Sequence, residues 1–427
     1  MSLGLEAHAL RERVMGELHA RPFAPLPSPS RVLHFAFSTG AAEAAADRQS
    51  LQAFCQERGL SGPTGDMKHF RVALEDVVLR WESHSEFTTY TWEFREKVSR
   101  GHSPFQPAAD GHAAYMRQVP QPGPLLVSVD LHLMAKDLPV SDFQAVFGRE
   151  QIAVAEVDGG SALVATDFEP DADGSVRMLV IARDLSAIMA GALVQRLLEI
   201  ETYRVFALLG LFEAQALAPV IRRIEIELPR LLQEMQMSEG FEANHRLLER
   251  LTGLAAELEA GAAASLYRFG ATRAYDELVS LRLNAIQERS VPGFPSWSEF
   301  LSRRLNPAMR TCASTEERQA NLSRKLARAA QLLRARVDVD LEQQNRSLLK
   351  AMNERARVQL RLQQTVEGLS VAAISYYIAG LAHILFEAVH SAGIHIDPAI
   401  ATGATVPFAV LGVAWTVRRI RRGHSAV

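Results

Sequence analysis

Two apolar runs close to the C-terminal end are the strongest pattern in the chain. They cover Leu369–Val389 and Ala399–Val417, and neither contains Lys, Arg or Asp. A transmembrane helix needs about 20 predominantly apolar residues, and both runs approach that length. The pattern therefore predicts a hairpin of two transmembrane helices, at about 369–389 and 399–417. A buried hairpin inside a soluble protein is the alternative interpretation.

The basic residues around these runs predict the orientation of the hairpin. Arginines precede the first run at Arg355, Arg357 and Arg361, and four more follow the second run between 418 and 422. The connector 390–398 contains neither Lys nor Arg. Because Lys and Arg collect on the cytoplasmic side, we expect a multi-pass membrane protein with both termini cytoplasmic.

In the segment before the hairpin, apolar residues recur with the spacing that is typical of helices. We expect a helical bundle over 185–365, with breaks near 238–240, near Gly270 and at 290–295. Its last helix is predicted to begin at about Thr315 and to run unbroken into the membrane. Leu326, Val337 and Leu348 are spaced eleven residues apart, which favours packing as a nearly straight helix pair, a form of coiled coil.

The first part of the chain alternates between strand and helix patterns. Residues 31–38, 70–74, 77–82 and 86–94 have the alternation and the β-branched and aromatic content of strands, as do four segments between 125 and 181. An Ala-rich helix is predicted over 41–58. The fold class is thus α+β, with a cytoplasmic α+β domain at 1–184, the helical bundle and stalk at 185–365, and the hairpin with its basic tail at 366–427.

Composition excludes several classes of function. The formal net charge of −3 gives no indication of nucleic-acid binding. Cys55 and Cys312 lie far apart, which suits a reducing cytosol and excludes a disulfide framework or a zinc ribbon. No P-loop, GxGxxG, HExxH or GxSxG pattern occurs. We therefore expect no enzyme, no cofactor and no metal site.

Polar residues in the first apolar run form one candidate site. Tyr376, His383, Glu387 and His390, together with Gly380, follow a spacing of four and three, so they share one helix face. Ionisable groups at membrane depth usually face a protein interior or a water path. These four residues are candidates for a pore or an ion site between subunits. The alternative is that the outer ones are simply hydrated at the membrane surface.

Candidate ligand residues in the first domain are Arg21, His84 and Glu86. His84 and Glu86 are two residues apart, so on a strand they would share a face and could hold a polar ligand. Arg21 could bind a carboxylate or phosphate through two hydrogen bonds. The alternatives are a sheet edge with exposed polar groups, and an arginine that attaches its proline-rich segment to the domain.

The chain resembles a bacterial family of predicted membrane-anchored proteins of unknown function. The resemblance rests on HARPF at 19–23, WESHSEFTTYTW at 81–92 and the hairpin followed by RRIRR at 418–422, and it covers essentially the whole chain. The overall build is also similar to the CorA-type magnesium channels. The Gly-Met-Asn signature of those channels is absent, because residues 386–390 read FEAVH. Magnesium selectivity is therefore not implied.

Two functions follow as hypotheses from these patterns. The first is a membrane-anchored scaffold or sensing protein that contacts the lipid bilayer, forms a homo-oligomer and binds a cytoplasmic protein partner. The second is an oligomeric CorA-like cation channel or transporter whose first transmembrane helix lines the pore. The first is favoured, because a single hairpin makes a pore only by oligomerising and carries no selectivity motif.

Overall fold

The computed structural model describes most of the chain, in two compact units. The described residues are 8–11, 14–15, 23–65, 67–75, 77–95, 104–105, 116–119, 121–135, 139, 142–392 and 397–424. The first unit consists of Met1–Leu232 and Leu251–Arg328, and the second of Gln233–Arg250 and Ala329–Val427. This division differs from the three predicted segments, because parts of the long helices pack on the sheet.

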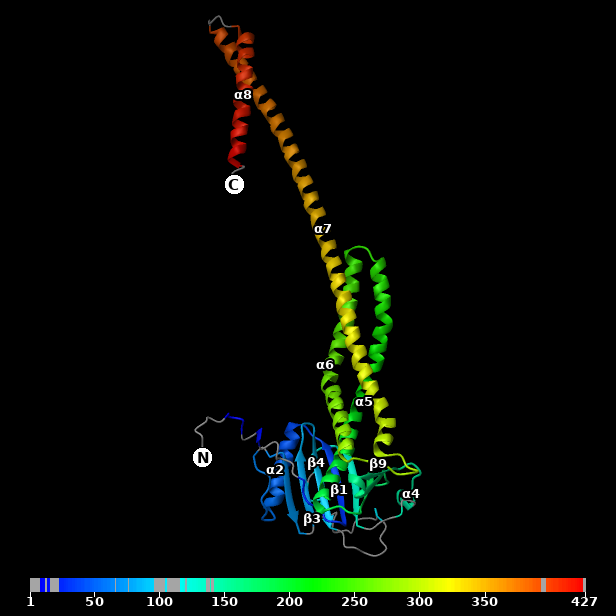
Figure 1. Cartoon of the computed structure of the whole chain (residues 1–427). Helices are drawn as coiled ribbons and strands as arrows, with labels where there is room; N and C mark the ends of the chain where they lie inside the picture. The colour runs from blue at the N-terminus through cyan, green and yellow to red at the C-terminus, as the bar shows by residue number, and fades with distance from the viewer. Residues whose placement is uncertain are drawn as a thin grey trace. The chain divides into compact units, whose positions relative to one another are not determined.

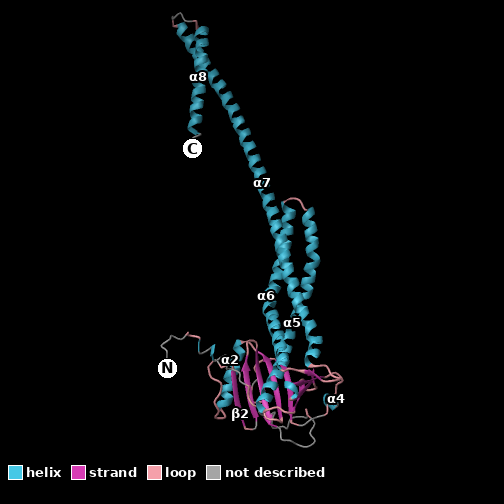
Figure 2. Cartoon of the chain, in the orientation of Figure 1, coloured by secondary structure: helices cyan, strands magenta, loops and turns pink. Residues whose placement is uncertain are grey.

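A nine-stranded sheet forms the centre of the first unit (Figure 2). Its strand order is β2-β3-β4-β1-β5-β8-β7-β6-β9. Only the β5–β8 pair is parallel, and the other neighbours are antiparallel. The strands are β1 (Ser30–Ser38), β2 (His69–Leu74), β3 (Val77–Ser83), β4 (Phe87–Arg95), β5 (Leu125–Met134), β6 (Ala153–Val157), β7 (Ala162–Pro170), β8 (Val176–Ala182) and β9 (Arg289–Ser290). The predicted strand segments are thereby confirmed.

Alternation along each strand gives the sheet two apolar faces. On β1, Val32 and Ala36 point to one face, while Phe35 and Phe37 pack in the core on the other. The second core contains Trp81, Leu79 and their neighbours on β3 and β4, covered by α2 (Ala41–Gln56). Figure 1 shows α2 alongside this part of the sheet. A short helix, α4 (Phe143–Phe147), and the 3₁₀ turn η2 (Asp158–Gly160) complete the unit near β6–β8.

The long helices α5 (Ala187–Met237) and α6 (Phe241–Ala285) cover the first face of the sheet. Leu193, Leu197 and Ile200 of α5 are fully buried in the core with Val279 of α6. α7 (Trp297–Ser391) begins in the same core, and Trp297 is fully buried. The predicted break near Gly270 is wrong, because α6 continues through it. The predicted start at Thr315 is also wrong, because α7 accommodates Pro307 and begins eighteen residues earlier, at Trp297.

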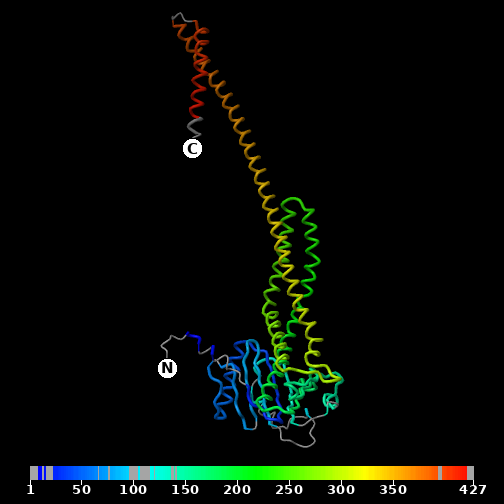
Figure 3. Tube along the Cα trace, viewed as in Figure 1, coloured from blue at the N-terminus to red at the C-terminus, as the bar shows by residue number. Residues whose placement is uncertain are grey.

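The second unit combines the turn between α5 and α6 with most of α7 and with α8 (Pro398–His424). Asn244 donates a hydrogen bond to Asp340 on α7 at 2.8 Å, and Arg336 donates one to the carbonyl of Met235 at 2.6 Å. α8 returns beside the end of α7 (Figure 3). Leu348 of the eleven-residue repeat is exposed in the described chain, so the coiled-coil packing expected there stays a prediction.

Within the residues that the structure describes, three helices are long and apolar enough to cross a membrane: α5, α7 and α8. Only 6% of the apolar window of α7 and none of that of α8 is buried, against 28% for α5. The apolar residues of α5 have a second explanation, because its first turns fill the core above the sheet. The α+β fold class with a long helical section is confirmed.

Candidate functional site

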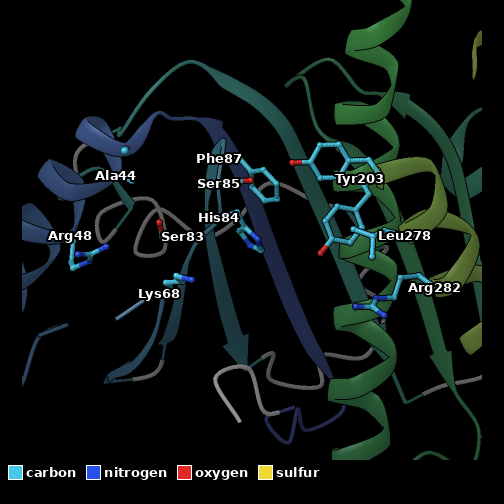
Figure 4. A pocket seen from close by; sticks show the side chains of 12 residues that line it. Ala44, Arg48, Lys68, Ser83, His84, Ser85, Phe87, Tyr203, Leu278 and Arg282 are labelled. Atoms are coloured by element: carbon cyan, nitrogen blue, oxygen red, sulfur yellow. The ribbon is translucent and has the colours of Figure 1, made fainter. Parts of the chain in front are cut away.

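A cleft of about 710 Å³ opens in the first unit beside the loop that joins β3 to β4. Figure 4 shows Arg48 and Lys68 on one side, Tyr203, Leu278 and Arg282 on the other, and the loop between them. The full lining is Ala41, Ala44, Arg48, Lys68, Ser83, His84, Ser85, Phe87, Tyr203, Tyr275, Leu278 and Arg282. The cleft is thus assembled from α2, the residue before β2, the β3–β4 loop with the strand ends that flank it, α5 and α6.

Hydrogen bonds hold the β3–β4 loop in place. The His84 N–H donates to the Phe87 carbonyl at 2.8 Å, and the Ser83 N–H donates to the Lys68 carbonyl at 2.7 Å. Arg268 on α6 donates to both oxygens of Glu86, at 3.3 and 2.5 Å. A two-bond Arg–carboxylate pair has the fixed geometry of a clamp. Glu86 therefore attaches the loop to α6, and it is not among the residues that line the cleft.

The charge around the cleft is positive. Arg48, Lys68 and Arg282 line it, and no carboxylate does among the residues that the structure describes. Arg48 Nη1 donates to the Gly65 carbonyl at 3.0 Å, and Arg282 Nε donates to the carboxylate of Glu199, which lies outside the lining. Walls that carry one sign of charge raise the local concentration of oppositely charged molecules. The cleft can therefore attract a small anion.

Aromatic rings form the other part of the lining. The His84 ring stacks on Phe87 with centroids 4.1 Å apart and planes inclined by 18°. Tyr203 and Tyr275 stack at 5.7 Å and 14°. Burial raises the pKa of Tyr275, and its hydrogen bond to the Glu86 carboxylate raises it further. Tyr275 therefore stays a neutral phenol near pH 7.

A smaller cavity of about 20 Å³ lies against the same residues, since His84, Phe87 and Tyr203 line both spaces. Three buried atoms around the smaller cavity make no hydrogen bond within the described part of the chain: Arg80 Nε, Glu82 Oε1 and Thr89 Oγ1. Glu82 Oε1 does lie 3.9 Å from His69 Nε2, a contact that is an ion pair when His69 is protonated. This space suits one water-sized polar group and no larger ligand.

His34 is a neutral member of this small cavity. Its ring bonds Thr91 at 2.8 Å and Thr202 on α5 at 3.0 Å. Burial, together with the positive charge of Arg80 and the proximity of His84, lowers the pKa of His34 to about 3. His34 is therefore uncharged at neutral pH, and we assign it to fixing α5 against the sheet rather than to proton transfer.

A chain of hydrogen bonds connects the two cavities. Arg80 Nη1 donates to Gln195 at 2.9 Å, and Gln195 donates to Glu199 at 3.0 Å. Glu199 in turn accepts the bond from Arg282 in the cleft wall. The charge of Arg282 is thus partly compensated from inside the protein.

The sequence profile of a family described as Protein of unknown function (DUF3422) matches residues 6–424, nearly the whole chain. The chain belongs to this family. No curated protein and no solved structure matches it. The expected membership in a family of unknown function is confirmed, and the loose similarity to CorA-type channels receives no support from these comparisons.

The structure of the DUF3422 chain separates the three candidate ligand residues. His84 lines the cleft, Glu86 is held by Arg268, and Arg21 lies outside the described residues. The expectation that His84 and Glu86 share a strand face is wrong, because both lie in the loop after β3 ends at Ser83. Sequence reasoning missed Arg48, Lys68, Tyr203, Tyr275 and Arg282, and no local motif marks them.

The candidate pore residues of the DUF3422 chain lie in the second unit. His383 Nδ1 is 3.0 Å from Thr402 Oγ1 on α8, within hydrogen-bond distance. Tyr376, Glu387 and His390 are exposed. Across the part of the chain that the structure describes, no three His, Cys, Asp or Glu side chains gather as a metal site would require.

Proposed function

We propose that this DUF3422 chain is a membrane-anchored sensing protein. Its first unit binds a small anion in the cleft, and the α7–α8 hairpin holds it on the cytoplasmic side of the bacterial inner membrane. The observation that carries this proposal is the lining of the cleft: three cationic side chains, four rings and no carboxylate among the described residues. A concave site with a few convergent polar groups is the usual form of a small-molecule site.

The origin of the lining residues supports sensing rather than simple storage. They come from α2, from the residue before β2, from the β3–β4 loop with its flanking strand ends and from the helices α5 and α6, so a bound anion would contact elements far apart in the sequence. The loop is itself attached to α6 through Glu86 and Arg268. A ligand that binds one arrangement of these elements better than another shifts their equilibrium. A cytoplasmic protein partner and a second copy of the chain are the proposed recipients of that change.

Features of the hairpin support its role as an anchor. The apolar windows of α7 and α8 are almost entirely exposed, which is costly in water and favourable in lipid. The Arg419 guanidinium lies 5.2 Å from the centre of the Trp415 ring, an arrangement typical of the membrane–water boundary. The His383 ring lies within hydrogen-bond distance of Thr402 in the same hairpin, so its polar group is paired between α7 and α8.

Thiol labelling tests the anchor. Cys55 and Cys312 are buried, so an added cysteine can be read selectively. In intact cells, a membrane-impermeant thiol reagent should label Ala392→Cys at the end of α7 and should not label Gln359→Cys. Labelling of Gln359→Cys before lysis would contradict the proposed orientation.

Ligand-induced stabilisation tests the cleft. The full chain in lipid nanodiscs should unfold at a higher temperature with inorganic pyrophosphate present, since a ligand of the folded state adds about 2.7 kcal/mol at a hundredfold excess over Kd. Lys68→Gln should remove most of this shift. Lys350→Gln is the matched control, because Lys350 is an exposed lysine on α7, in the second unit. Equal shifts in wild type and Lys68→Gln would refute anion binding in the cleft.

A further inference from the structure

We propose that α7 pairs with α7 of a second copy of the chain, as a parallel two-stranded coiled coil, along the segment between the α5–α6 turn and the membrane. The feature that carries this is a stripe of residues that begins at Leu341, ends at Leu369 and follows an alternating spacing of four and three. We call it the stalk stripe. The inference rests on the anchor in the proposed function, which gives both copies the same direction, and it names the surface through which a second copy is recognised.

The stalk stripe has no cover among the described residues. Before it begins, α7 contacts the α5–α6 turn, where Asp340 accepts a hydrogen bond from Asn244 at 2.8 Å, and Leu333 is fully buried. From 341 to 366 every residue is exposed, with Leu348 at 61% and Leu362 at 64%. Figure 1 shows α7 continuing past the turn in this region. Soluble proteins rarely leave a long apolar surface in water, so the stripe marks an interaction site.

Lipid is not the cover of the stalk stripe. A membrane span needs about 20 predominantly apolar residues, and charged side chains inside it are costly. The segment before the apolar window of α7 carries charged side chains at Glu342, Arg346, Lys350, Glu354, Arg355, Arg357 and Arg361. This part of α7 therefore lies in water, and another polypeptide is required to bury its leucines.

The residue pattern identifies that polypeptide as a second copy of the chain. Leucine occupies positions 341, 348, 362 and 369 of a series with a spacing of seven, and Arg355 occupies the middle one. The intervening positions of the stripe are Asn345, Met352, Gln359 and Val366. Leucine in one series and an asparagine in the other is a combination that favours two parallel strands in a fixed register. In such a pair identical residues face each other, so the two Asn345 amides can bond to one another.

The length and the composition of the stalk stripe suit a pair held at one membrane. The stripe spans four seven-residue repeats, about 42 Å of helix, and sustained coiled coils have about three or four repeats. The eleven-residue spacing of the preceding segment leads from Leu348 to Gln359, whereas the seven-residue spacing reaches Leu362 and Leu369. Arg355 and Gln359 at the centre weaken the pair. Anchoring both copies in one bilayer raises their effective concentration and compensates for this weakness.

Disulfide cross-linking of the full chain in isolated membranes tests the pairing. Leu341→Cys and Leu362→Cys each place one thiol on the stalk stripe, while the native Cys55 and Cys312 are buried. With a mild oxidant, each variant should form a covalent dimer. Because the two positions lie about 30 Å apart along the helix, only a parallel pair in register allows each to link to itself. Lys350→Cys, on the opposite face of α7, is the matched control and should link at least tenfold more slowly.

A further substitution measures the contribution of the stripe itself. Leu348→Ala should lower the early yield of the Leu362→Cys dimer about tenfold or more, because a buried leucine contributes at least that factor. Lys350→Gln should not lower it, and unaltered thermal unfolding establishes that each variant is folded. Equal rates of linking for Leu341→Cys and Lys350→Cys would reveal random collision and overturn the inference. Linking at only one of the two stripe positions would also overturn the parallel pair.

Failure of the pairing is distinguishable from failure of the proposed anchor. If neither stripe cysteine links in chains that stay with the membrane after an alkaline carbonate wash, the pairing is overturned and the anchor stands. If the wash releases the chain from the membrane, the anchor is overturned, and the inference that rests on it is overturned as well.

Discussion

Asp47 is the residue whose replacement tests most directly how the cleft is held together. It lies on α2 one position before Arg48 and is only 4% exposed. Its carboxylate accepts hydrogen bonds from Trp81 Nε1 at 2.7 Å and from the Tyr90 hydroxyl at 2.6 Å. These bonds attach α2 to β3 and β4, and so they position one wall of the cleft. We expect Asp47→Ala to destabilise the first unit and to weaken anion binding.

The size of the effect follows from the groups left unpaired. Asp47→Ala leaves two buried donors, Trp81 Nε1–H and the Tyr90 hydroxyl, each costing about 1–3 kcal/mol without an acceptor. Burial raises the pKa of Asp47, although the bonds from Tyr90 and Trp81 and the charge of Arg48 act against this, so the buried charge is itself unfavourable. Removing this buried charge offsets part of the stability lost with the two hydrogen bonds. We expect a net destabilisation of about 2–4 kcal/mol for Asp47→Ala, and about half for Asp47→Asn, whose oxygen can still accept one bond.

Thermal unfolding followed by circular dichroism measures this change. About 2 kcal/mol corresponds to a decrease of about 3 °C in the Tm of the first unit, because the unfolding entropy of roughly 2.1 cal/mol/K per residue makes the shift per kcal/mol small for a unit of this size. Tyr90→Phe removes one of the two donors and should cost about as much as Asp47→Asn. Asp173→Asn is the matched control, because Asp173 is exposed in a turn and should stay within about 0.5 kcal/mol of wild type.

The result that would refute this reasoning is an Asp47→Ala variant as stable as wild type. That outcome would mean that α2 is held by its apolar contacts alone, through Leu51 and Phe54. A destabilised Asp47→Ala variant that binds pyrophosphate at wild-type affinity would separate the effect of Asp47 on stability from its effect on anion binding. The carboxylate would then stabilise the fold without positioning Arg48.

Two further predictions concern other charged groups. Burial acts to raise the pKa of Asp130, but hydrogen bonds from His132 and Arg31 outweigh it and lower the pKa below its ordinary value of 3.8. The ionised Asp130 carboxylate therefore stabilises the folded protein above pH 3.8, and this stabilisation is lost as pH falls through the folded-state pKa. Asp130→Asn should cost about 3–5 kcal/mol of stability at pH 7, and this cost should shrink in unfolding curves measured in acid. A cost that does not change with pH would refute this prediction. In the membrane, the anchor proposal predicts no cation flux into liposomes and no effect of Glu387→Gln on insertion, whereas wild-type flux reduced by this substitution would establish the channel alternative.

Local patterns were sufficient for the long strands and for α8 of the DUF3422 chain. The strands β2, β3 and β4 follow from alternation and β-branched content, and the exposed helix α8 follows from an apolar run bounded by Arg418. Both signals are local: strand alternation follows the two-residue period of the backbone, and a membrane-length apolar run is recognised by its own length. The start of α7 was less accessible to sequence reasoning, because the predicted start lay at about Thr315 whereas Trp297 is already helical and the helix runs through Pro307.

The candidate site was decided only by tertiary structure. Glu86 and Arg268 are 182 positions apart, and the cleft joins Arg48 to Arg282 through a sheet edge and two helices. No periodicity reports such pairings, because they depend on which faces pack together and in what register. The same limit explains α5, whose apolar length meets the criterion for a membrane span while Leu193 and Leu197 fill the core on the sheet. Hydrophobicity along a chain measures the tendency to leave water, and only the fold decides whether protein or lipid receives the helix.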